Sequence, residues 1–256
     1  MLSPDDPAGR AILLVVLAGL IALLVYRAVR KDRNEFQRFK RFERTRNRQR
    51  MMRKWLLDSL AMFGGAAVII LLLAGQFVPL LQREVDRWPI GLWWRSLLAD
   101  TGSLVPGFAA GLGVALVGAT IAAVVLARRS ESVPTIGDIG ALLPRNRPEL
   151  VLGALLSVNA GVVEELLFRL AVPALIFGTT GSALAAVTGG VALFGTLHFY
   201  QGWPGIVGAT VIGALLMALY LATGSILVAI VAHALIDLRS LVLIPMLVFG
   251  VQRVRE

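Results

Sequence analysis

The sequence contains no cysteine, and only 16% of its 256 residues are charged. The absence of cysteine excludes disulfides, thiolate metal sites and a cysteine nucleophile. Hydrophobic residues make up 57% of the chain, and the mean hydropathy is +0.77. A soluble domain needs more polar residues than this to cover its surface. We therefore expect the solvent of this chain to be lipid.

Apolar stretches recur along the whole chain. About 20 apolar residues in a helix cross a hydrocarbon core about 30 Å thick. Seven stretches are this long, and the last would count as two if the helix breaks at Pro245: 11–29, 55–80, 104–127, 150–175, 182–200, 204–222 and 225–250. None alternates with a period of two, as the strands of a membrane barrel do. The sequence predicts an all-α, multi-pass protein of the cell membrane with seven or eight transmembrane helices.

Positive charge is concentrated in one segment. Residues 27–54 hold thirteen bases and three acids, a net charge of +10. Short loops rich in Lys and Arg stay on the cytoplasmic side, which makes 27–54 a predicted cytoplasmic loop. Phe36, Phe39 and Phe42 recur every three residues among the bases, a spacing that also suits a helix on anionic lipid. Membrane lipid is thus an expected partner, and nucleic acid is not.

We divide the chain into two predicted parts. Residues 1–130 form N-terminal transmembrane helices together with the basic cytoplasmic loop 27–54, and residues 131–256 form a core that carries the chemistry. The reason is the distribution of ionisable side chains. Between residues 150 and 250 there are only seven, each costly in hydrocarbon unless it is paired or lines a hydrated cavity: Glu164, Glu165, Arg169, His198, His233, Asp237 and Arg239.

The spacing of these residues is that of helix neighbours. Glu165 and Arg169 are four residues apart with the acid first, which favours an ion pair on one helix face. Glu164 points about 100° away from Glu165 and stays available for acid–base chemistry. His233 and Asp237 are also four apart, so that the carboxylate can accept a proton from the imidazole or both can face one cavity. Phe194 and His198 repeat this spacing.

Each feature alone has a structural explanation. His198 suits an interfacial residue near aromatic neighbours, His233 and Asp237 suit an interhelical hydrogen bond, and Glu165 and Arg169 suit a structural ion pair. Their concentration in a hundred otherwise apolar residues favours a functional site.

Three short motifs carry a family resemblance. Glu164 to Arg169 reads EELLFR and resembles an EExxxR motif, Phe194 to His198 reads FGTLH and resembles FxxxH, and His233 to Asp237 reads HALID and resembles HxxxN/D. Together, over about residues 140–245, they resemble the CPBP family of intramembrane endopeptidases, which includes the prenyl-protein CAAX endopeptidases. Asp237 stands where Asn is the commoner residue of the family.

The resemblance implies a cavity between helices in which water attacks a peptide carbonyl of a protein or peptide substrate. Glu164 would be the general base, His198 would orient or polarise the water, and Arg169 would hold Glu165. His233 and Asp237 would line the oxyanion side, although an ionised Asp237 cannot donate a hydrogen bond.

A metal-dependent version of this chemistry stays open. Two histidines and one carboxylate also form a catalytic zinc set. In that version Glu164, His198 and His233 bind Zn²⁺ and Glu165 is the base. The resemblance therefore implies an intramembrane protease that depends either on glutamate alone or on a metal, and we favour the metal-independent version because Asp237 has no evident role as an extra ligand.

Two other functions compete with proteolysis. A transporter could use the intramembrane Glu, His and Asp residues as a proton or ion relay, but the chain shows no inverted repeat and the residues lie in one half only. A non-catalytic membrane scaffold could keep the cavity without the chemistry. It is disfavoured because every catalytic position that the resemblance implies is filled.

Overall fold

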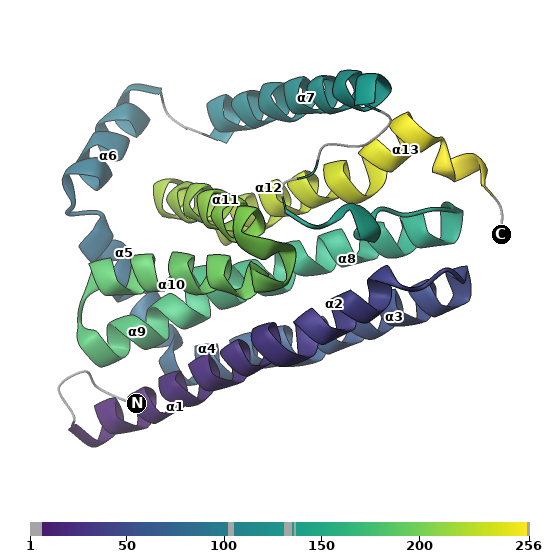
Figure 1. The fold of residues 1–256 in the computed structure, drawn as a ribbon. Helices are drawn as coiled ribbons and strands as arrows, with labels where there is room; N and C mark the ends of the chain where they lie inside the picture. Colours follow the sequence, from purple (N-terminus) through teal and green to yellow (C-terminus); the bar gives the residue numbers. More distant parts are fainter. Residues whose placement is uncertain (1–6, 102–104, 131–134, 136, 255–256) are drawn as a thin grey trace.

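The protein is a bundle of long helices. The computed structural model describes residues 7–101, 105–130, 135 and 137–254, and every regular element within these residues is helical (Figure 1). The all-α prediction is confirmed. The alanine-, leucine- and glycine-rich stretches form helices because, in lipid, a helix satisfies its own backbone hydrogen-bonding groups.

The N-terminal part begins with a helical hairpin. Its first arm is continuous from α1 (Pro7–Tyr26) through a π-helical turn at Arg27–Asp32 to α2 (Arg33–Lys40). Its second arm runs from α3 (Thr45–Ser59) through a π-helical turn to α4 (Gly65–Ala74) and on to α5 (Val78–Val85). The two arms contain 34 and 41 residues, or about 51 and 62 Å at 1.5 Å per residue.

Both arms of the hairpin are longer than the hydrocarbon core of about 30 Å. The basic segment 27–54 is therefore the tip of the hairpin, helical except at residues 41–44, and extends past the apolar part. Phe36 and Phe39 are 2% and 0% exposed, so this aromatic face packs on protein and not on lipid. Most of the bases lie on the exposed face of the tip, whereas Arg27 and Arg48 are buried.

A buried ion pair joins the hairpin to the rest of the bundle. Arg48 of α3 and Glu149 of α8 (Arg147–Glu165) are both fully buried, with Nε and Oε1 3.0 Å apart. The Arg48 guanidinium also donates to the carbonyl oxygens of Ala141 and Leu143, and Glu149 accepts from the backbone N–H of Arg145. These contacts hold α3 against α8.

The remaining helices follow in chain order. Beyond α5 the chain forms α6 (Pro89–Thr101) and α7 (Val105–Ser130), and α7 runs along one side of the bundle in Figure 1. After α8, a π-helical turn at Leu166–Ala171 leads into α9 (Val172–Thr180). Pro173 lacks the N–H that would bond to the Arg169 carbonyl, which favours a departure from α-helical geometry at this turn.

The last helices are α10 (Ala183–Leu197), α11 (Gly202–Thr223), α12 (Ile226–Leu238) and α13 (Ile244–Phe249). Between α10 and α11 the chain forms a short 3₁₀ turn and reverses at Gly202, whose φ of 77° favours glycine. The helix α11 then packs back on α10.

Six helical segments of the described chain are long and apolar enough to cross a membrane. The sequence predicts seven stretches, and the difference comes from 182–200 and 204–222. These two stretches form one continuous helical segment, Ala183–Thr223, in which α10 and α11 fold back on each other. The eighth helix, expected if the chain broke at Pro245, is not formed, because Ile226–Phe249 is continuous. A π-helical turn at Arg239–Leu243 directly precedes α13, and the missing N–H of Pro245 favours this departure from α-helical geometry.

The helices α8 and α12 approach each other closely at Gly161. A Cβ atom at Gly161 would lie 3.0 Å from the Ala234 Cβ and 3.0 Å from the Ile230 carbonyl oxygen. Glycine is therefore required here for the two helices to meet. One turn further along α8, Glu165 lies opposite His233, the residue before Ala234.

Candidate active site

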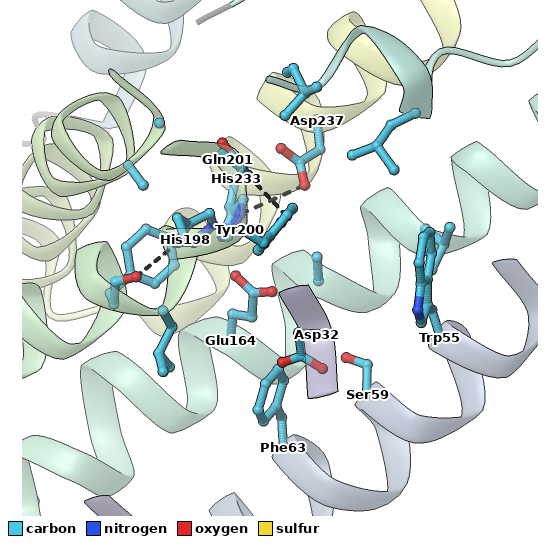
Figure 2. A pocket seen from close by; sticks show the side chains of 18 of the residues that line it. Asp32, Trp55, Ser59, Phe63, Glu164, His198, Tyr200, Gln201, His233 and Asp237 are labelled. Atoms are coloured by element: carbon cyan, nitrogen blue, oxygen red, sulfur yellow. Dashed lines mark hydrogen bonds and ion pairs between the residues drawn. The ribbon is translucent and has the colours of Figure 1, made fainter. Parts of the chain in front are cut away.

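A cavity of about 420 Å³ lies between the N-terminal hairpin and the C-terminal helices. This is within the usual range for small-molecule sites, about 300–1,000 Å³. Four of the six predicted site residues line it: Glu164, His198, His233 and Asp237. Figure 2 shows these side chains converging from α8, from the turn after α10 and from α12.

Glu164 and Glu165 face different surroundings, as the sequence predicts. Glu164 lines the cavity and is partly exposed to it, whereas Glu165 is fully buried. Among the described residues, Glu164 has no hydrogen-bonding or ion-pair partner, but it interacts electrostatically with His233 and Asp237. Glu165 contacts Arg169 and His233. Glu164 is thus the carboxylate available to a ligand in the cavity.

The predicted ion pair between Glu165 and Arg169 is present. Arg169 Nε and Glu165 Oε2 are 3.0 Å apart, but their geometry is not that of a hydrogen bond. The Arg169 guanidinium lies 4.5 Å from the Phe194 ring centroid, and its Nη2 donates to the Gly213 carbonyl oxygen at 3.4 Å. Arg169 is only 2% exposed and does not line the cavity. It therefore supports Glu165 from behind the cavity wall.

His198 lies directly after α10, where its Nδ1 is 2.8 Å from the Phe194 carbonyl oxygen. Because a carbonyl oxygen only accepts hydrogen bonds, we assign the proton to Nδ1. In neutral His198 the other ring nitrogen, Nε2, is then a hydrogen-bond acceptor. The ring centroid lies 4.9 Å from that of Phe194, as expected for residues four apart on one face.

His233 makes a contact that the sequence does not reveal. Its Nδ1 is 2.7 Å from Glu165 Oε1, across 68 residues of chain. We assign the proton to Nδ1, because a carboxylate oxygen accepts hydrogen bonds. The Nε2 atom of His233 is 3.8 Å from Asp237 Oδ2, which is longer than a hydrogen bond. His233 and Asp237 both line the cavity, as one of the two predicted arrangements requires.

The predicted zinc set is not assembled in this arrangement. Within the described part of the chain, no three His, Asp or Glu side chains are grouped closely enough to hold a metal ion. The Nδ1 atoms of His198 and His233 are also both engaged by protein oxygens. Zinc binding by Glu164, His198 and His233 stays an untested prediction, and we derive no step through a metal.

The sequence reading missed several residues of the cavity wall. Tyr200 and Gln201 follow His198, and their positions in the segment LFGTLHFYQGW are the only signal that could have pointed to them. The hairpin supplies side chains to the opposite wall that no motif marks, among them Asp32, Trp55, Ser59 and Phe63 (Figure 2). The site is therefore built from both predicted parts of the chain.

The fold and the cavity define a multi-pass helical membrane protein with a carboxylate and two imidazoles in an internal site. Residues 146–239 match the family model described as "Type II CAAX prenyl endopeptidase Rce1-like". This segment holds all six predicted site residues, and the match supports membership of the CPBP family. The match supports a CAAX-type intramembrane protease in general, with a protein or peptide substrate. Neither curated proteins nor solved structures gave a match.

Proposed function

We propose that this protein is an intramembrane endopeptidase of the cell membrane that hydrolyses a peptide bond with water activated by Glu164. The observation that carries the proposal is the division of labour between two adjacent carboxylates. Glu165 is bound by Arg169 and His233, whereas Glu164 faces the cavity and has no ion-pair partner among the described residues. A general base has to be free to reach the proton that it removes.

The reaction begins with a water molecule held beside Glu164. The Glu164 carboxylate accepts one proton as the water oxygen forms a bond to the carbonyl carbon, and the carbonyl π electrons move to the oxygen as an oxyanion. When the oxyanion re-forms the C=O bond, the C–N bond breaks and the leaving nitrogen takes a proton from the Glu164 carboxylic acid. The products are a carboxylic acid and an amine, and Glu164 is a carboxylate again.

His198 is proposed to orient the water. Its Nδ1 proton is donated to the Phe194 carbonyl oxygen, so Nε2 accepts a hydrogen bond from the second hydrogen of the water. With one hydrogen directed to Glu164 and the other to His198, a lone pair of the water oxygen is left to attack the carbonyl carbon.

His233 is proposed to organise the site behind the water. Its contact with Glu165 joins α12 to α8, and its other ring nitrogen faces Asp237. Asp237, which is partly exposed, presents an acceptor to a substrate N–H.

A transporter using the same residues as an ion relay would also lose function on neutralising Glu164, and a scaffold would not. Peptide cleavage separates the three functions. We expect detergent-purified wild type to cleave members of a diverse peptide library, detected by mass spectrometry, and Glu164→Gln to show no cleavage above background.

The matched control is Glu84→Gln, which makes the same change in an ion pair with Arg87 away from the cavity. We expect this variant to cleave at the wild-type rate. Cleavage by Glu164→Gln at the wild-type rate, or no cleavage by folded wild type, would overturn the proposal.

A further inference from the structure

The proposed reaction creates an oxyanion, and such a charge is normally stabilised by hydrogen-bond donors already in place. The motif residues around the cavity supply few donors. His198 and His233 donate their Nδ1 protons to Phe194 and Glu165, and Asp237 as a carboxylate only accepts. The six predicted site residues therefore leave the oxyanion without an evident neutral donor.

We propose that the Tyr200 hydroxyl supplies this donor and is a catalytic residue of the site. This inference rests on the proposed function. Tyr200 lines the cavity two residues after His198, and Figure 2 shows it between Glu164 and Asp237.

The hydrogen bonds of the cavity wall single out this hydroxyl. The Tyr200 Oη accepts a hydrogen bond from Gln201 Nε2 at 2.9 Å, and no described residue accepts its own proton. Two other neutral donor groups on the wall each have a partner: Trp55 Nε1 donates to Glu35 at 2.8 Å, and Asn159 Nδ2 donates to Ser59 at 3.0 Å. The Tyr200 proton is therefore available to a ligand.

A second hydroxyl, that of Ser59, also has no acceptor among the described residues. Ser59 belongs to the hairpin wall and lies beside Asp32 in Figure 2, on the opposite side of Glu164 from both histidines. Tyr200 lies on the histidine side, with its ring stacked near His198 at a centroid distance of 6.2 Å. Since His198 is proposed to hold the attacking water, Tyr200 is the better placed hydroxyl.

The surroundings of Tyr200 fix both its ring and its hydroxyl. The Tyr200 ring makes an edge-to-face contact with Phe36 of the hairpin, at 5.3 Å between centroids, in addition to its stacking near His198. Gln201 directs its Nε2 at the hydroxyl. Its backbone is held in place because the backbone carbonyl oxygen accepts a hydrogen bond from the Asp138 N–H at 2.8 Å. Gln201 is thus a positioning residue. Such preorganisation is what oxyanion stabilisation requires.

The test is Tyr200→Phe, which keeps the ring contacts with His198 and Phe36 and removes only the hydroxyl. Loss of one oxyanion donor lowers kcat by about 100- to 1,000-fold. We expect a fall of this size with KM changed by less than about twofold, since the hydrogen bond forms only in the transition state. The matched control is Tyr220→Phe, the same deletion at a buried tyrosine of α11 that does not line the cavity. We expect wild-type kcat from it.

A second measurement separates catalysis from folding. A peptide aldehyde whose hydrate mimics the tetrahedral intermediate should bind Tyr200→Phe more weakly than wild type by a factor similar to the loss in kcat, whereas the corresponding peptide alcohol should bind both equally. Unchanged kcat, a rise in KM alone, or equal weakening of both ligands would overturn the role of Tyr200. If Glu164→Gln is inactive while Tyr200→Phe has full kcat, this inference alone fails. If Glu164→Gln is fully active, the proposed function fails.

Discussion

The buried ion pair between Arg48 and Glu149 gives a quantitative prediction about stability. Replacing Arg48 by Met keeps an apolar side chain of similar length but removes the Nε contacts to Glu149 at 3.0 and 3.2 Å. Glu149 then stays fully buried, with only the Arg145 N–H still donating to its carboxylate. An uncompensated buried charge of this kind costs about 3–5 kcal/mol of unfolding free energy. For a chain of this size, the melting temperature should fall by about 6–20 °C.

Thermal unfolding of the purified protein in detergent, followed by circular dichroism, measures this effect. Arg46→Met is the matched control, because Arg46 is an exposed residue of the same helix, and we expect a change within about 0.5 kcal/mol. The double variant Arg48→Met/Glu149→Leu removes both charges and should recover most of the lost stability. The reasoning is refuted if Arg48→Met melts with the control, or if the double variant is as unstable as Arg48→Met alone.

Three further predictions concern the site. Gly161→Val should push α8 away from Ala234 on α12 and slow peptide cleavage by about 100-fold; a variant with wild-type turnover would show that the close approach is not needed. Arg169→Lys should lower the unfolding free energy by about 1–3 kcal/mol in a thermal melt, because an ammonium cannot replace the planar guanidinium beside Glu165; wild-type stability would contradict this. Introducing Asp237→Asn into the Tyr200→Phe variant should raise kcat by about tenfold, because an amide can donate to the oxyanion; unchanged kcat would argue against a donor shortage.

The sequence predicts those features of the site that depend on one helix at a time. The 100° offset between adjacent residues separates Glu164 from Glu165, and the spacing of four places Arg169 beside Glu165 and His198 beside Phe194. These contacts follow from helix geometry alone, without knowledge of how the helices pack.

Contacts between helices could not be predicted in this way. The bond from His233 to Glu165 depends on the register of α12 against α8, and that register is set by the side-chain-free surface at Gly161. No spacing in the sequence gives the distance between residues 68 positions apart. The contact between Phe36 of the hairpin and Tyr200 likewise depends on how the hairpin packs against the C-terminal helices, and no sequence spacing predicts it.

The packing of the basic segment could not be predicted from its charge. Most of its positive charges lie on the exposed face of the two arms, whereas Phe36 and Phe39 are buried. Two acids offset part of the repulsion across the hairpin: Asp58 accepts from Lys31 and Lys54, and Glu35 accepts from Lys54 and Trp55. The total charge of a segment does not show which face of a helix carries it.

The central claim is that Glu164 acts as a base on water, and a single turnover in H₂¹⁸O with a metal chelator present tests it most directly. The account predicts that cleavage continues, that one ¹⁸O atom enters the new carboxyl group of the peptide product, and that none enters Glu164. Incorporation of ¹⁸O into the Glu164 carboxylate would show attack by Glu164 itself as a nucleophile. Loss of cleavage on adding the chelator, restored by Zn²⁺, would show a metal-dependent enzyme. Either result would contradict the account.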